Sequence, residues 1–173
     1  MSIPAAEYVI QEETIEDQPG IREVNRLAFC GEEEARLVDQ LRADGEVVVS
    51  LVAVDEDVVL GHALFSWLPI ERRGQIIRAA ALAPVAVRPE RQRQGIGSTL
   101  IRRGIELCRE RGCAAVIVLG HPEYYPRFGF TAELAANLRA PFAGPAFMAL
   151  ELTPGSLAGG GEVRYPTAFA GLE

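Results

Sequence analysis

The stretch that decides the fold is VRPERQRQGIGSTL, residues 87–100. It follows an apolar run, contains two glycines one residue apart, and leads into a segment with helical periodicity. A strand, a glycine loop and a helix N-terminus in this order direct free backbone N–H groups and the positive end of the helix dipole toward an anion. Glycine suits such a loop because a side chain would keep a phosphate away from the backbone. The stretch therefore predicts a phosphate-binding turn.

Two common phosphate-binding motifs do not fit this turn. The Rossmann motif G-x-G-x-x-G needs a third glycine where Leu100 stands, and Val116–Leu119 lacks the acidic residue expected about 20 residues downstream. A P-loop needs a lysine, but all 17 basic residues of the chain are arginine. The absence of lysine also excludes Schiff-base and pyridoxal-phosphate chemistry. A tight turn that merely starts a helix remains the alternative.

Length and composition indicate one globular domain. The chain has 173 residues, of which 49% are hydrophobic, and this is enough for a single core. The net charge of −7 argues against a general nucleic-acid binder. Cys30, Cys108 and Cys113 lack C-x-x-C spacing, which is typical of reduced thiols and not of a zinc site or disulfides. With no signal peptide and no apolar run of roughly 18 residues, we expect a cytoplasmic protein without metal, nucleic-acid or membrane partners.

The hydrophobic pattern predicts an α/β (α+β) fold around one central mixed sheet. We expect residues 1–173 to form a single domain, with a loosely ordered C-terminal segment at about 154–173. Pro69–Gln75 is interpreted as a polar loop. Strands are expected at 8–12, 46–54, 58–68, 76–87, 114–119, 146–152 and 162–169, and helices at 17–29, 32–43 and 97–111, with a further helical turn within 121–130.

The residues around the turn match a longer motif. Val87, Pro89, Gln92, Gly95 and Gly97 give the pattern V-x-P-x-x-Q-x-x-G-x-G, which resembles the signature of the GNAT superfamily of acyl-CoA-dependent N-acyltransferases. The resemblance implies a mostly antiparallel sheet of six or seven strands with splayed middle strands and about four helices. It also implies that the loop amides bind the pyrophosphate of coenzyme A. The residues implied to bind acetyl-CoA are Val85, Ala86, Val87, Gln92, Arg93, Gln94, Gly95, Ile96, Gly97 and Ser98.

Arginines near the turn are candidates for the 3′-phosphate of coenzyme A. Arg91 and Arg93 lie in the loop, and Arg102 and Arg103 lie on the following helix. For the two helix residues, a solvated face without a ligand is an equal alternative.

Pro84 lies in the middle of the expected strand 76–87. In GNAT proteins this strand carries a bulge and diverges from its neighbour, so that pantetheine can lie between them. Proline lacks an N–H and therefore loses nothing where the ladder is already broken. By resemblance, Val85 and Val87 offer main-chain groups to pantetheine, and the amide of Val85 or Ala86 polarises the thioester carbonyl. The alternative is that Pro84 ends the strand early.

A second motif, GHPEYYPRFGF, occupies residues 120–130 and resembles a small bacterial branch of predicted N-acetyltransferases. Tyr125 stands four residues before Gly129, where the family places the tyrosine that protonates the departing thiolate. A phenol with a pKa near 10 is protonated at neutral pH and suits this role. Tyr124 is adjacent and is the alternative acid, but on a helical turn it is expected to face elsewhere. The alternative for both tyrosines is a packed aromatic cluster.

No carboxylate occurs in 76–87 or 114–119, where the family often has a glutamate as general base. His121 is the best candidate base, with an orienting or capping role as its alternative. Glu32, Glu33 and Glu34 are candidates for binding a cationic acceptor, or they complement a helix dipole. His62 is expected to pack inside the sheet.

These observations predict an N-acetyltransferase with Tyr125 and His121 as catalytic residues and no metal. A primary amine, on a small molecule or a peptide N-terminus, would attack acetyl-CoA directly in a ternary complex. We expect a monomer or a homodimer. A non-catalytic acyl-CoA-binding or sensing module on the same fold is the main alternative, and a nucleotide-binding regulator is a weaker one.

Overall fold

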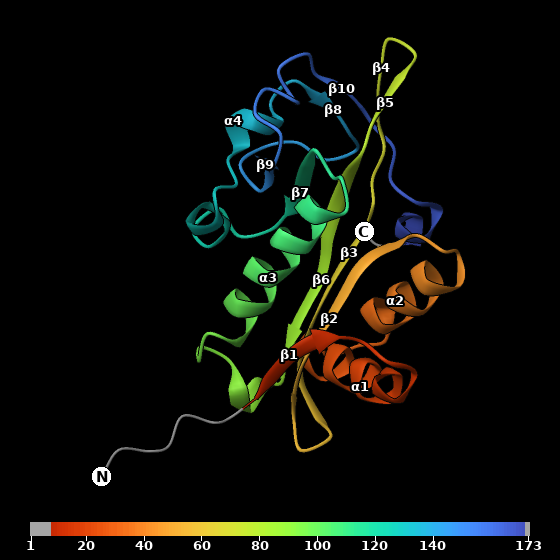
Figure 1. Cartoon of the computed structure of the whole chain (residues 1–173), viewed down its shortest axis with the longest axis vertical. Helices are drawn as coiled ribbons and strands as arrows, with labels where there is room; N and C mark the ends of the chain where they lie inside the picture. The colour runs from red at the N-terminus through yellow and green to blue at the C-terminus, as the bar shows by residue number, and fades with distance from the viewer. Residues whose placement is uncertain (1–7, 172–173) are drawn as a thin grey trace.

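The computed structural model describes residues 8–171, and its main element is a six-stranded sheet (Figure 1). All neighbouring strands are antiparallel except β6 and β7, which are parallel. The predicted mixed, mostly antiparallel sheet is confirmed. In spatial order the strands are β1 (Val9–Glu12), β2 (Val47–Asp55), β3 (Val58–Trp67), β6 (Ala79–Val87), β7 (Ala115–Leu119) and β9 (Phe147–Glu151).

Helices cover both faces of this sheet (Figure 1). Helices α1 (Gln18–Phe29) and α2 (Glu33–Ala43) lie on one face, and α3 (Ile96–Glu110) lies on the other. Side chains alternate along a strand, so Leu64 packs toward α1 and α2 while Phe65 packs toward α3. Within residues 8–171 no helix is long and apolar enough to cross a membrane. The short helices are η1 (Ile15–Asp17), η2 (Pro89–Arg91), η3 (Tyr125–Phe128), α4 (Ala132–Ala135) and η4 (Thr167–Gly171).

A second, four-stranded sheet was not predicted. Its strands in spatial order are β5 (Gln75–Ile77), β4 (Ile70–Arg72), β10 (Gly161–Val163) and β8 (Leu138–Arg139).

This second sheet corrects two predictions about the chain between β3 and β6. The expected polar loop 69–75 contains β4, and the expected single strand 76–87 is divided between two sheets. The chain reverses at Arg73 and Gly74, which both have positive φ. It breaks again at Arg78, whose carbonyl accepts a hydrogen bond from the Ala114 amide (2.7 Å). Arg78 is the one charged residue in 76–87, but a single arginine within an apolar run does not by itself indicate a change of sheet.

The C-terminal segment, for which loose order was expected, contains β10 and η4 in this structure. Leu157 and Val163 are buried against the same cluster as β4 and β7 residues.

Strand β6 carries a bulge at Pro84. Leu82 pairs with Phe65 and Val85 pairs with Ala63, so that Ala83 and Pro84 together oppose the single residue between those partners. This is the arrangement expected from a proline inside a strand.

Strands β6 and β7 separate before the bulge. Their parallel pairing covers Ala79–Ala81 opposite Ala115–Ile117 and then ends, although β6 continues to Val87. The middle strands are therefore splayed, as predicted. We use "the gap" for the space beside Leu82–Val87 on the β7 side.

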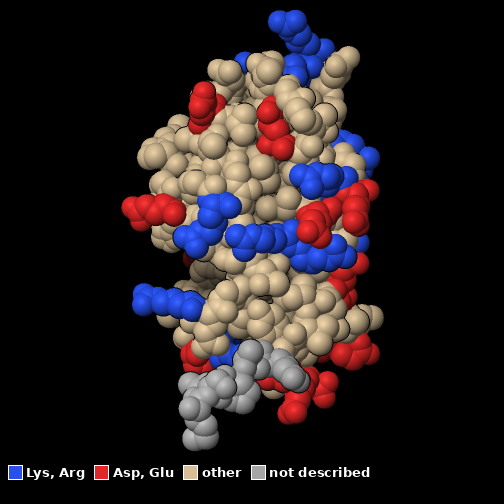
Figure 2. Space-filling view, turned by 60° about the vertical axis from the view of Figure 1, so that its left-hand side comes forward, with Lys and Arg blue, Asp and Glu red and all other residues tan. Residues whose placement is uncertain are grey.

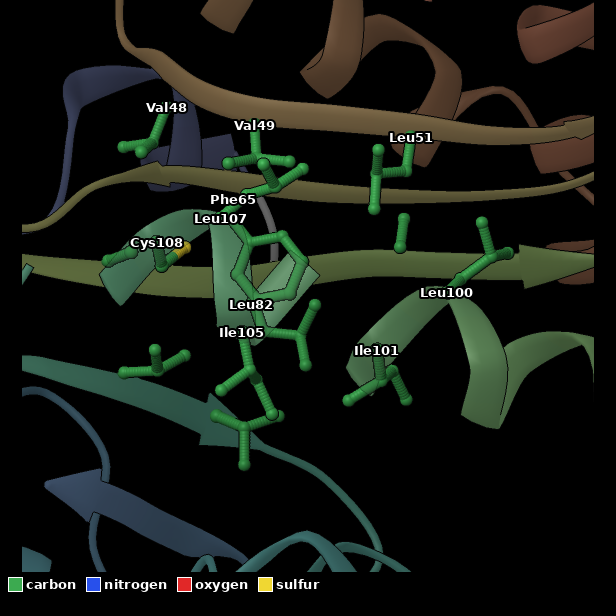
Figure 3. Close-up of a cluster of buried hydrophobic side chains, with 14 of the residues drawn as sticks. Val48, Val49, Leu51, Phe65, Leu82, Leu100, Ile101, Ile105, Leu107 and Cys108 are labelled. Carbon is green, nitrogen blue, oxygen red and sulfur yellow. The ribbon is translucent and has the colours of Figure 1, made fainter. Parts of the chain in front are cut away.

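Phe65 is the central side chain of the core between the sheet and α3 (Figure 3). It is fully buried, and its ring lies directly against Gly104 of α3. A Cβ atom at Gly104 would overlap the ring, so glycine at this position allows α3 to approach the sheet closely. This contact fixes the helix whose N-terminus follows the glycine loop.

His62 is buried in the sheet, as expected, and belongs to a hydrogen-bonded cluster beneath α1. The Asn25 side-chain nitrogen donates to the Ile21 carbonyl (2.9 Å) and lies 3.1 Å from Nδ1 of His62. Nδ1 is thus an acceptor, and Nε2 carries the proton toward Ser50 Oγ at 2.9 Å. Burial, followed by the charge of Arg42, lowers the pKa of His62 to about 3.

This buried histidine makes stability depend on pH. Between pH 6.5 and about 3 the unfolded chain binds a proton at His62 and the folded chain does not, so stability falls as the pH falls through this window. At pH 5 we expect a loss of about 2 kcal/mol relative to pH 7.5 from this group. Urea unfolding at both pH values should show that His62→Gln loses less stability on acidification than wild type does. Equal losses in the two proteins would contradict the role of His62.

Candidate functional site

The main cleft, about 800 Å³ in volume, lies where the gap meets the glycine loop. Its walls come from the end of α1, the end of β6, the loop and start of α3, and the segment after β7. Ala86 and Gln94 are the predicted site residues that do not line it. The predicted residues that do line it are Val85, Val87, Gln92, Arg93, Gly95, Ile96, Gly97, Ser98, His121 and Tyr125.

The start of α3 forms the anion-binding end of the main cleft. Gly95 precedes the helix with a φ of +85°, a conformation that favours glycine. The first helical hydrogen bond is donated by the Thr99 amide to the Gly95 carbonyl (3.0 Å). The amides of residues 96–98 therefore precede the helical ladder and remain available to an anion, reinforced by the dipole of a four-turn helix.

Side chains of the loop hold its shape. Gln92 donates from Nε2 to the Val87 carbonyl (3.0 Å), and Arg91 donates from Nε to Gln94 Oε1 (3.0 Å). Gln92 and Gln94 thus shape the loop, and Gln94 does not line the main cleft. Arg91 does line the cleft, and its Nη2 is buried with no hydrogen-bond partner among residues 8–171. A buried guanidinium nitrogen without a partner beside free helix amides indicates a site for an anionic ligand.

The backbone of β6 presents alternate residues to the gap. The Arg88 amide donates to the Leu60 carbonyl on β3 (2.9 Å), so the Ala86 amide, two residues earlier, also points to β3. The amides of Val85 and Val87 point the other way, into the gap. The sequence left open whether the Val85 or the Ala86 amide polarises the thioester carbonyl. Only the Val85 amide is placed to contact a ligand in the gap. The Ala86 side chain is buried beneath α1 and α2.

Tyr125 belongs both to an aromatic cluster and to the cleft wall. Its ring lies 5.1 Å from Tyr124 and 5.8 Å from Phe130 between centroids. Burial, followed by the neighbouring Tyr124, raises the pKa of Tyr125 to about 12. The hydroxyl group is therefore a proton donor at any physiological pH. A Cβ atom at Gly120 would overlap this ring, so glycine after β7 makes room for Tyr125.

The prediction that Tyr124 faces away from the site is wrong. Tyr124 lines the same cleft, and its hydroxyl lies 2.9 Å from Ser98 Oγ. The prediction assumed helical spacing, but the short helix begins only at Tyr125, with Pro126 next. Tyr124 thereby links the motif after β7 to the first turn of α3.

His121 is exposed and lines the cleft, and its carbonyl accepts hydrogen bonds from the Tyr124 and Tyr125 amides (3.1 and 3.3 Å). The glutamates at 32–34 do not line the cleft. Glu33 and Glu34 occupy the first turn of α2, which agrees with a role in complementing its dipole. Among the described lining residues there is no Asp or Glu.

Besides Tyr124, three cleft residues were not predicted: Ala28, Phe29 and Arg127. Phe29 ends α1 and is 41% exposed, although it is large and apolar. An exposed phenylalanine before a glycine-containing loop is a weak sequence signal for a binding surface. Arg127 lies within the second motif and covers the Tyr124 ring, with its guanidinium carbon 4.4 Å from the ring centroid.

The acidic chain gathers arginines on the face that carries α3. Figure 2, turned to bring this side forward, shows a band of basic side chains across the middle of the face, with acidic side chains above it, below it and next to its right-hand end. Arg102, Arg103 and Arg109 are exposed on α3. Glu106 and Glu110 are exposed on the same helix, and Arg103 pairs with Glu106 (3.0 Å), so the surface of α3 carries only a small excess of positive charge. No group of three or more potential metal-ligating side chains was found within residues 8–171.

The sequence matches a known family over most of its length. The model of the acetyltransferase (GNAT) family covers residues 12–130, from β1 to the end of the second motif. The chain belongs to the GNAT family. It is 38% identical over 159 residues to YhbS of Escherichia coli K12, named an uncharacterized N-acetyltransferase. This alignment covers 88% of this chain and 93% of YhbS. It is also 44% identical over 116 residues to YjhQ, another uncharacterized N-acetyltransferase of the same strain. That alignment covers 66% of this chain and 64% of YjhQ.

Solved GNAT structures show the same fold. The complex of E. coli YhbS with CoA has a TM-score of 0.89 at 34% identity and covers 100% of this chain and 97% of that one. A GNAT acetyltransferase of Brucella melitensis in complex with acetyl-CoA has a TM-score of 0.79 at 34% identity, with 95% and 99% coverage. Two similar GNAT proteins therefore bind CoA or acetyl-CoA.

Proposed function

We propose that this protein transfers an acetyl group from acetyl-CoA to a primary amine. The observation that carries the proposal is the main cleft, which joins free helix amides at one end to an open gap between two strands at the other. An acyl-CoA has a polyanionic head and a long, narrow arm with amide groups. The cleft offers matching groups in the same order, and two relatives at 34% identity bind this class of molecule.

The pyrophosphate would bind at the amides of residues 96–98, next to the unpartnered guanidinium nitrogen of Arg91. The pantetheine arm would lie along β6 and exchange hydrogen bonds with the main chain of Val85 and Val87, like an added strand. The thioester would then lie near the bulge at Pro84, at the far end of the gap from the loop.

The chemistry needs one proton donor and one proton acceptor. The neutral amine nitrogen attacks the thioester carbonyl carbon, and the Val85 amide stabilises the oxyanion. As the carbonyl forms again, the carbon–sulfur bond breaks and Tyr125 gives its proton to the leaving thiolate. His121 takes the proton that the amine must lose, directly or through water. Proton exchange with solvent returns both residues to their starting states.

The test of this function measures both binding and turnover. Titration calorimetry with acetyl-CoA should show binding, and a thiol-detecting reagent should show CoA release that depends on an added amine. Mass spectrometry should then find the amine heavier by one acetyl group. The absence of a carboxylate from the described cleft lining is what favours the alternative, a non-catalytic acyl-CoA-binding module. Binding without release, across a broad panel of amines, would favour that alternative.

Replacing Arg91 is expected to weaken the binding of CoA. Arg91→Met should raise the Kd for CoA roughly 10- to 100-fold, because a hydrogen bond to a charged group contributes about 1.5–3 kcal/mol. Calorimetry should also show that salt weakens binding less in the variant than in wild type. Arg109→Met is the matched control, since Arg109 is exposed on α3 and does not line the cleft. Similar Kd values for the two variants would contradict the role of Arg91.

A further inference from the structure

A second cavity lies farther along the same gap. It has a volume of about 220 Å³ and begins where the pairing of β6 and β7 ends. We call it the aromatic pocket. It is lined by Leu82 and Ala83 of β6, Leu119 of β7, and the rings of Phe142, Tyr165 and Phe169.

The pocket lies at the reacting end of the proposed donor site. Along β6, the main cleft is lined by Val85 and Val87, and the aromatic pocket is lined by Leu82 and Ala83 on the other side of Pro84. A donor whose phosphates lie at α3 would bring its thioester to this bulge. Whatever occupies the aromatic pocket is thus next to the acyl group.

The walls of the pocket select for an apolar ring. Phe142 and Tyr165 meet edge to face at 5.4 Å between centroids, and Tyr165 and Phe169 do so at the same distance. An apolar cavity of about 150 Å³ is enough to take up benzene. Leu119 is 48% exposed although it ends a buried strand, so apolar surface is left uncovered at the pocket.

Charge argues against a polycationic acceptor. Neither cavity has an Asp or Glu among its described lining residues. Tyr165 carries the only polar side chain in the described lining of the aromatic pocket. Burial raises the pKa of this tyrosine to about 12, so it stays neutral and can donate one hydrogen bond.

We propose that the aromatic pocket binds the apolar, ring-sized group of the acceptor amine, so that the enzyme prefers aryl-alkylamines over small polar amines and polyamines. This inference rests on the proposed acetyl transfer. An acetyl donor leaves the pocket empty, because two carbons do not fill about 220 Å³. The ring of the acceptor fills it instead, and the amine is then held at the thioester.

The experiment compares 2-phenylethylamine, ethylamine and spermidine on the full chain. With acetyl-CoA, wild type should show a kcat/KM for 2-phenylethylamine at least roughly tenfold above that for the other two. Phe142→Ala should reduce the ratio between 2-phenylethylamine and ethylamine to within about threefold, and Phe142→Leu should restore most of it. Ile76→Ala, at an exposed apolar residue of β5 outside both cavities, should keep the wild-type ratio.

Two further measurements separate the possible failures. Calorimetry on the CoA complex should show that 2-phenylethylamine binds more tightly than ethylamine, and that Phe142→Ala removes this preference. If this binding preference and its loss in Phe142→Ala are observed but no amine causes thiol release, the pocket assignment stands and the proposed function fails. If amines react with no preference for the ring, the assignment is overturned and the function stands. If Phe142→Ala instead alters the ratio of hexanoyl-CoA to acetyl-CoA, the pocket takes an acyl chain and the assignment is also overturned.

Discussion

Replacing Tyr125 with phenylalanine is expected to lower kcat by roughly 10²- to 10⁴-fold, the usual contribution of a general acid. The ring would keep its contacts with Tyr124, Phe130 and Gly120, so the cleft should keep its shape. Only the proton donor is lost, and the thiolate must then leave unprotonated. We expect the Kd for acetyl-CoA to change by less than about threefold, because the phosphates bind at the other end of the main cleft. Stopped-flow or steady-state thiol release and calorimetry measure the two quantities.

Tyr124→Phe is the matched control. Its hydroxyl lies 2.9 Å from Ser98 Oγ, near the anion-binding amides, so its loss should act on CoA affinity. A net hydrogen bond contributes about 1 kcal/mol, or roughly a fivefold change in Kd. A fall in kcat for Tyr124→Phe as large as that for Tyr125→Phe would mean that the acid has been misassigned.

The raised pKa of Tyr125 also predicts how the rate depends on pH. A group with a pKa of about 12 keeps its proton through the neutral and mildly alkaline range. The pH profiles of wild type and Tyr125→Phe should therefore have the same shape up to about pH 10. An alkaline limb that the variant abolishes in this range would show that Tyr125 titrates there.

Phe65→Ala is expected to destabilise the protein by about 3–5 kcal/mol, the usual cost of removing a fully buried phenylalanine. The ring fills the space between the sheet and α3 among Leu100, Ile105 and Leu107 (Figure 3), and it lies directly against Gly104. The cavity left behind would undermine the helix that carries the anion-binding amides. Urea unfolding measures the loss. Val58→Ala, at an exposed position on the same strand, should change stability by less than about 0.5 kcal/mol.

A double-mutant cycle tests the Phe65–Gly104 contact itself. Gly104→Ala alone should cost about 1–3 kcal/mol, because the new methyl group overlaps the ring. With Phe65→Ala present the clash is gone, and the second substitution should cost much less than it does alone. Additive effects would show that the ring does not occupy the space opposite Gly104.

Local motifs explain how much of the site the sequence could predict. The turn from Val87 to Gly97 is contiguous, and each glycine or glutamine in it has a backbone consequence that can be read from its neighbours. Pro84 marks the bulge for the same reason, since a residue without an N–H is incompatible with an intact central ladder. The buried position of His62 also follows from the apolar residues on both sides of it.

The features that the sequence did not predict depend on contacts formed in the folded chain, mostly between residues that are distant in sequence. The aromatic pocket combines Leu82, Leu119, Phe142 and Tyr165 from four separate segments, and no local spacing relates them. The second sheet itself depends on a distant partner, because β5 pairs with β4 in a local hairpin and β4 in turn pairs with β10, roughly 90 residues later along the chain. The choice of Val85 over Ala86 required the hydrogen bond from Arg88 to Leu60, which fixes the direction of each amide.

A crystal structure of this protein with acetyl-CoA would show whether the donor lies in the gap with its thioester at Tyr125. We expect the pyrophosphate on the amides of residues 96–98, the pantetheine arm beside Val85 and Val87, and the Tyr125 hydroxyl within hydrogen-bonding distance of the thioester sulfur. Acetyl-CoA bound outside the gap would overturn the proposed donor site, and acetyl-CoA bound within it but with Tyr125 remote from the sulfur would overturn the role of Tyr125 as the acid.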